Sequence, residues 1–208
     1  MIYLLLTFAF SSVFYFLILR AHKLGAGGGL YVIGIMWCPA LAAFATLKLH
    51  GRKLSKLGWK WPQTTYATMS WFIPLLYATV AYAIIWASGR GGFPNHEFMQ
   101  HLVPRMGLRA SPVVSTVVYV LLVGSFGLVD GLATALGEEI GWRGFLVPEL
   151  FKAVGFTNTA LISGVVWACW HYPILIWGDY NTGTATWYGL TCFTVLVVRS
   201  LWSLPGCA

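Results

Sequence analysis

Long apolar stretches of about helix length constrain the fold of this chain more than any other feature. A helix of about 20 apolar residues crosses roughly 30 Å of hydrocarbon, and six segments of the 208-residue sequence approach or exceed that length. The pattern predicts an all-α, polytopic integral membrane bundle of about six transmembrane helices, forming a single membrane domain over residues 1–208. The six segments are residues 2–19, 30–49, 66–87, 113–136, 156–177 and 184–203, the last being the weakest.

Composition favours a bilayer over water or nucleic acid as the environment. Apolar residues make up 58% of the chain and charged residues 9%, far from the averages of a soluble domain. The net charge of +7 does not indicate nucleic acid, because five of the thirteen basic residues fall in one short connection, where the positive-inside rule explains them. We therefore expect membrane lipid as a partner, no nucleic acid and, from the compact size, a bacterial plasma membrane. The five basic residues are Lys48, Arg52, Lys53, Lys56 and Lys60.

Two adjacent acids give the strongest indication of a functional site. A charge at mid-bilayer costs about 2.5–3.5 kcal/mol on insertion scales, so folding alone does not explain Glu138, Glu139 and Arg143 in an apolar region. On a helix, Glu139 and Arg143 lie one turn apart and can form an ion pair, whereas Glu138 is rotated away from them. A carboxylate in an apolar pocket without a cation is the better proton acceptor. We assign the role of base to Glu138 and that of orienting group to Glu139.

Three glycines form a separate stripe on the predicted glutamate helix, which we place near residues 128–150. Gly137, Gly141 and Gly144 give a small-residue pattern that allows another helix to approach the acidic face closely. The helix is therefore expected to be buried against a neighbour.

A histidine lies in the next predicted helix, near residues 156–177. His171 has Trp167 one turn before it on the same face, and Pro173 loosens the backbone just beyond it. A glutamate pair on one helix and a histidine on the next, antiparallel helix form a plausible acid–base arrangement. Two plainer interpretations stay open: a hydrogen-bonded core histidine, and a neutralised structural cluster of the acids with arginine.

Both motifs resemble those of the CPBP family of intramembrane proteases. This family includes the type II CAAX prenyl endopeptidases and bacterial proteins linked to bacteriocin processing or self-immunity. Its Glu-Glu-x-x-x-Arg motif matches Glu138 to Arg143, and its Phe-x-x-x-His motif matches Trp167 to His171, with tryptophan in place of phenylalanine.

The resemblance implies peptide-bond hydrolysis within the membrane, on a membrane-associated or prenylated substrate. It implies that Glu138 activates water with help from His171, while Glu139 and Arg143 shape the site. Members have been described both as metalloproteases and as metal-free glutamate enzymes. A divalent metal such as zinc, if present, would be held by Glu138 and His171. The pair His96 and His101 is no zincin motif, because its spacing of five differs from the required four.

The third motif of the family, His-x-x-x-Asn, has no counterpart after His171, so we interpret the chain as a C-terminally truncated member. Asp179 and Asn181 are candidate substitutes, although solvation in a loop is the simpler role. The alternative function is a catalytically inactive relative that binds a peptide or partner, as in bacteriocin self-immunity. A proton-coupled carrier ranks third. No oligomeric state is predicted.

Overall fold

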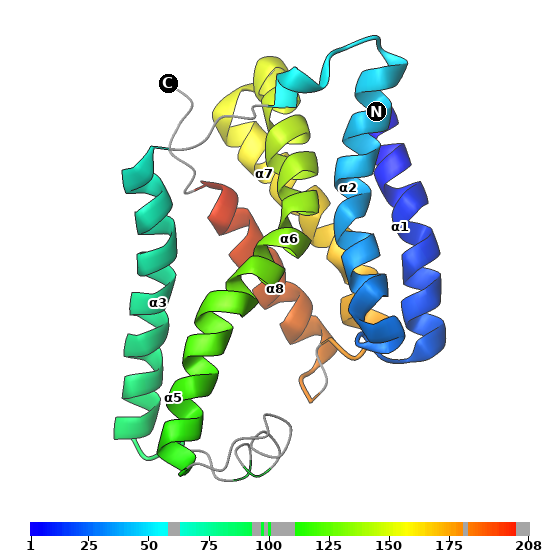
Figure 1. The fold of residues 1–208 in the computed structure, drawn as a ribbon. Helices are drawn as coiled ribbons and strands as arrows, with labels where there is room; N and C mark the ends of the chain where they lie inside the picture. Colours follow the sequence, from blue (N-terminus) through cyan, green and yellow to red (C-terminus); the bar gives the residue numbers. More distant parts are fainter. Residues whose placement is uncertain (58–62, 93–96, 98–99, 101–110, 181–182, 203–208) are drawn as a thin grey trace. The chain divides into compact units, whose positions relative to one another are not determined.

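The computed structural model describes residues 1–57, 63–92, 97, 100, 111–180 and 183–202, and all regular structure in these ranges is helical (Figure 1). This confirms the prediction of an all-α bundle with long apolar helices. The α-helices are α1 Ile2–Ala21, α2 Leu30–Leu49, α3 Thr64–Ala87, α5 Pro112–Leu122, α6 Leu128–Glu139, α7 Val147–Trp177 and α8 Thr186–Trp202. Short 3₁₀ turns η1 Ala26–Gly29 and η2 Leu54–Leu57 and π-helical segments η3 Val123–Gly127 and η4 Ile140–Leu146 connect or extend them.

Each of the six predicted apolar segments contains helix over most of its described length. Within the described ranges, four helical runs are long and apolar enough to cross a membrane, and Thr186–Val198 is a shorter apolar helix. The longest run has 65 residues, far more than one crossing needs. The number of spans therefore stays a prediction. The four runs are Ile2–Ala21, Ala26–Leu49, Thr64–Ala87 and Val113–Trp177.

Two compact units divide the chain. Unit 1 consists of Met1–Trp59 with Gly131–Ala208, and unit 2 consists of Lys60–Asp130. In unit 2, the side chains of α3 are mostly apolar and none of them is buried, which is typical of a helix surrounded by lipid tails. Unit 1 contains every predicted site residue that lies within the described ranges.

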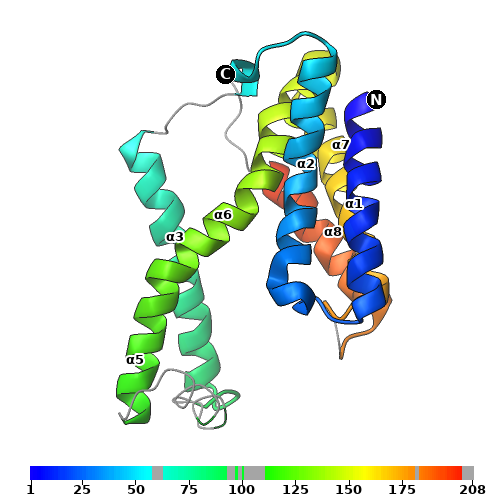
Figure 2. The same ribbon diagram turned by 45° about the vertical axis from the view of Figure 1, so that its right-hand side comes forward.

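The α1–α2 hairpin is the first element of unit 1, and its two helices lie side by side in both views (Figures 1 and 2). Their connection uses three successive glycines, Gly27, Gly28 and Gly29, with φ of 64°, 65° and 85°. Glycine adopts this left-handed conformation without the steric penalty of other residues, so the chain can reverse sharply here. This glycine-rich turn is thus the bend of the hairpin.

Polar contacts tie this hairpin to α7 inside the apolar core. The Tyr15 hydroxyl donates to the backbone carbonyl of Trp170, and Trp170 Nε1 donates to Ser11 Oγ at 2.7 Å. At the end of α7, Asp179 Oδ1 accepts a hydrogen bond from the backbone N–H of Leu24 at 2.9 Å. A buried polar group without a partner is costly, so these bonds specify how α1 and α7 pack.

Glycines at the start of the glutamate motif let α6 and η4 approach the backbone of α2. A Cβ atom on Gly137 would lie 2.6 Å from the carbonyl oxygen of Met36, and one on Gly141 would lie 2.3 Å from Pro39 Cβ. Both separations are too short for any larger residue. The close approach predicted from the glycine stripe is confirmed, and the partner helix is α2.

A break in α7 allows the chain to reverse after the glutamate motif. Gly155 has φ of 73° and ψ of 178°, so the helical conformation is interrupted there. The break lies between the two helices predicted near residues 128–150 and 156–177. The second part of α7 then brings Trp167 into hydrogen-bond contact with Glu138.

Candidate active site

Glu138 is held in the interior of unit 1. It lies at the end of α6, where the Gly137 and Gly141 contacts fix the helix against α2, and only 6% of its surface is exposed. Its Oε2 atom accepts a hydrogen bond of 2.7 Å from the indole Nε1 of Trp167. No cation is paired with it among the described residues. The carboxyl group is therefore buried, oriented by one donor, and retains acceptor capacity.

Glu139 has a different environment from its neighbour, as predicted. Its Oε1 atom forms an ion pair with Arg143 one turn further on, and its side chain is 43% exposed. The Arg143 guanidinium also lies over the Trp167 ring, 5.1 Å from the ring centroid. The pair persists although the backbone changes from α-helix to π-helix at Ile140, a rare geometry that occurs frequently at functional sites.

His171 faces the same region from α7. Its Nδ1 atom lies 3.1 Å from the backbone carbonyl oxygen of Trp167, which can only accept a hydrogen bond, so Nδ1 carries the proton in that bond. Nε2 of the neutral ring is then a free acceptor. The ring packs against Trp170 and Phe193, with centroids 4.8 and 4.6 Å away. Aromatic packing fixes the imidazole plane.

Glu138 and His171 line one cavity of about 130 Å³. A water molecule occupies about 30 Å³ of liquid, so the space admits water next to both groups. The rest of the lining is mostly apolar, which strengthens electrostatic interactions within it. The other lining residues are Leu24, Val32, Ile35, Met36, Trp170, Ile174, Leu175 and Tyr180.

Of the remaining candidates from the sequence, Asp179 lies within the described residues. Asp179 accepts a hydrogen bond from the Leu24 backbone N–H and is absent from the lining of this cavity, a contact that the sequence did not predict. His96, His101 and Asn181 lie outside the described residues.

Metal binding can be judged from the donor set at the cavity. A catalytic zinc takes three protein ligands, but the lining of this cavity offers two side chains of the usual zinc-binding kinds, Glu138 and His171. Within the described ranges, no three His, Cys, Asp or Glu side chains are grouped closely enough to hold a metal ion. The described residues thus do not fit a zinc site.

Two tryptophans have roles that the sequence did not reveal. Trp167 was interpreted as an aromatic wall beside the imidazole, but it is also the hydrogen-bond donor to Glu138. Trp142, only 1% exposed, lies next to the same carboxyl group, and its Nε1 atom has no hydrogen-bond partner in the described part of the chain. Tryptophan at the motif position usually held by phenylalanine was the available signal, because only tryptophan offers an N–H donor.

Fold and site together define a polytopic helical membrane protein with a carboxylate and an imidazole at one small buried cavity. Residues 120–206, which include both motifs, match the family model described as Type II CAAX prenyl endopeptidase Rce1-like. The chain is also 30% identical over 66 residues to the CAAX prenyl protease 2 of Methanococcus maripaludis. The resemblance predicted from the motifs is thereby confirmed.

These matches cover only part of the chain, and the family model matches its second half. The aligned 66 residues are 30% of this chain and 24% of the relative, so the chain matches about a quarter of that protein's length. No solved structure matches the chain.

Proposed function

We propose that this chain is an intramembrane endopeptidase of the CAAX type that cleaves a membrane-associated or prenylated peptide. The observation that carries the proposal is the shared cavity, in which Glu138 and His171 can contact the same water molecule. The similarity to a protein named CAAX prenyl protease 2 supports the substrate class. A bacterial plasma membrane is the proposed location.

The proposed mechanism uses Glu138 as the base. Water bound between the free carboxylate oxygen and His171 Nε2 loses a proton to Glu138 as its oxygen attacks the scissile carbonyl carbon. The tetrahedral oxyanion collapses, the C–N bond breaks, and the proton passes from Glu138 to the leaving amine. The Trp142 indole N–H lies next to Glu138 and is a further candidate to position the carboxylate.

The supporting residues keep Glu138 separate from the nearby cation. Arg143 is paired with Glu139 and lies over the Trp167 ring, and among the described residues it forms no ion pair with Glu138. Trp167 occupies one oxygen of Glu138 and leaves the other for water. Glu139, Arg143 and Trp167 therefore act as positioning residues.

The test is cleavage of a farnesylated CAAX-like peptide by the purified full chain in nanodiscs, with the products identified by mass spectrometry. Glu138→Gln and His171→Gln should each reduce turnover at least about a hundredfold, because general-base catalysis contributes roughly 10²–10⁴ in rate. Glu97→Gln, at an exposed acid in unit 2, is the matched control and should retain activity.

Two results contradict the proposal. One is cleavage that survives Glu138→Gln. The other is peptide binding without cleavage by the unmodified chain, which would favour the peptide-binding relative instead.

A further inference from the structure

Basic side chains and an apolar wall meet at the end of α2, far along the chain from the glutamate motif. Three cations surround an open cavity of about 540 Å³. The remaining lining is apolar, so one site combines positive charge with a surface for hydrocarbon. The lining residues are Phe44, Ala45, Lys48, Arg52, Lys53 and Leu54.

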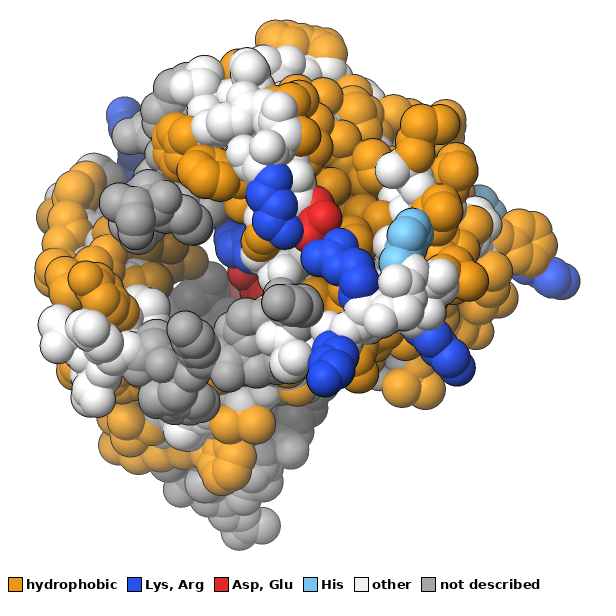
Figure 3. All heavy atoms as spheres, turned by 90° about the horizontal axis from the view of Figure 1, so that it is seen from above, with side chains coloured by type: hydrophobic (Ala, Val, Ile, Leu, Met, Phe, Trp, Pro, Cys, Tyr) orange, Lys and Arg blue, Asp and Glu red, His pale blue; other side chains and the backbone are white. Residues whose placement is uncertain are grey.

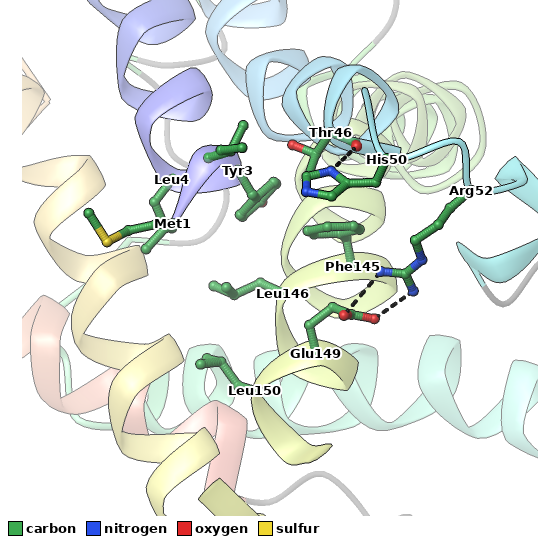
Figure 4. A pocket seen from close by; sticks show the side chains of 11 residues that line it. Met1, Tyr3, Leu4, Thr46, His50, Arg52, Phe145, Leu146, Glu149 and Leu150 are labelled. Carbon is green, nitrogen blue, oxygen red and sulfur yellow. Dashed lines mark hydrogen bonds and ion pairs between the residues drawn. The ribbon is translucent and has the colours of Figure 1, made fainter. Parts of the chain in front are cut away.

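The charges at this cavity are incompletely neutralised. Glu149 accepts two hydrogen bonds from Arg52, of 3.1 and 2.8 Å (Figure 4). It accepts a third, of 2.8 Å, from Lys152. The Glu149 carboxylate therefore already binds two cations, Arg52 and Lys152. Lys48 and Lys53 form no ion pair within the described ranges. Basic side chains gather on the face that Figure 3 shows, beside few acids.

The cavity lies where the headgroups of a bilayer are expected. The 20-residue apolar helix α2 ends at Leu49, and a helix of this length brings its end to the membrane surface. A second cavity of about 600 Å³ shares Arg52 and extends between the first residues of α1 and the start of α7 (Figure 4). Apolar side chains such as Leu4 and Leu150 line it, so the hydrocarbon-compatible surface continues past the basic rim.

We propose that Lys48, Arg52 and Lys53 form a binding site for the phosphate group of an anionic phospholipid. The two unpaired ammonium groups neutralise the phosphate, and Arg52, fixed by Glu149, presents its remaining N–H groups beside it. The glycerol and upper acyl chain lie on Phe44 and Leu54. A zwitterionic lipid binds more weakly, because its own cation faces the unpaired lysines. The site does not depend on the proposed hydrolysis.

Native mass spectrometry of the purified full chain tests this site, with phosphatidylglycerol and phosphatidylcholine of identical acyl chains. Phosphatidylglycerol should bind more tightly than phosphatidylcholine. The double variant Lys48→Gln/Lys53→Gln should weaken phosphatidylglycerol binding about 10- to 30-fold, since each basic residue near an anionic surface contributes about 1 kcal/mol. Lys48→Arg/Lys53→Arg keeps both charges and should keep binding.

The matched control removes two other basic charges, at the opposite end of the α1–α2 hairpin. Arg20→Gln/Lys23→Gln should leave phosphatidylglycerol binding unchanged, because these exposed residues lie at and beyond the end of α1. Equal affinity for both lipids, or an equal loss in the control, overturns the proposal. If glycerol 3-phosphate displaces phosphatidylglycerol at equal concentration, the site takes soluble phosphates and the lipid assignment fails.

Discussion

Trp167 donates its indole N–H to Glu138 at 2.7 Å, joining two motifs that lie 29 residues apart in the chain. Hydrogen bonds to an ionised group are roughly twice as strong as neutral ones, so this contact restricts the rotation of the carboxyl group. The same indole ring supports the Arg143 guanidinium. One side chain therefore positions both the proposed base and the neighbouring cation.

Trp167→Phe should lower kcat about tenfold while leaving KM nearly unchanged, because phenylalanine keeps the aromatic ring but removes the donor that orients Glu138. Steady-state cleavage of the farnesylated peptide measures both constants. Trp187→Phe, at a residue 71% exposed, is the matched control. An unchanged kcat would show that the hydrogen bond does not contribute to positioning.

Gly137→Ala should destabilise unit 1 by about 1–3 kcal/mol, since its Cβ would lie 2.6 Å from the Met36 carbonyl oxygen and the helices would have to separate. Gly131→Ala on the same helix meets no atom within 4 Å and should be neutral or stabilising. Thermal unfolding in detergent, followed by circular dichroism, compares the two variants. Equal melting temperatures would contradict the close packing.

Asp179→Ala should destabilise the protein by about 0.5–1.5 kcal/mol, because the partly buried Leu24 N–H loses its hydrogen bond. The effect should appear in thermal unfolding rather than in the chemistry of cleavage. The specific activity of the remaining folded protein should match that of the unmodified chain. A large loss of kcat with normal stability would instead restore Asp179 as a catalytic candidate.

Treatment with 1,10-phenanthroline or EDTA should leave peptide cleavage unchanged, since the cavity offers two ligand-type side chains where a catalytic zinc needs three. Activity is measured after dialysis against chelator, with metal content checked by mass spectrometry. Loss of cleavage that zinc restores would refute the metal-free glutamate mechanism.

Local periodicity accounts for what the sequence predicted well. The apolar segments correspond to helices because a helix of about 20 apolar residues is long enough to cross the hydrocarbon layer of a bilayer. The Glu139–Arg143 pair follows from a spacing of four residues. The glycine stripe predicted close packing because small residues at such intervals share one helix face.

Contacts between segments that are distant in the chain could not be predicted from local spacing in the sequence. The partner of Asp179 is Leu24, 155 positions earlier, and nothing near either residue indicates the pair. The spacing also predicted an α-helix through Arg143, whereas the structure has a π-helix from Ile140 to Leu146. That change depends on how η4 packs against α2, which is a property of the assembled fold.

The contact of Gly137 and Gly141 with Met36 and Pro39 has a practical consequence for protein engineering. The surface that locates the glutamate motif belongs to a helix that contributes no proposed catalytic group. Anyone grafting residues 137–143 onto another helical scaffold would have to transplant Met36–Pro39 as well. The smallest transferable form of this centre is therefore three segments rather than a linear motif: the glutamate motif, the part of α2 against which it packs, and the part of α7 that carries Trp167 and His171.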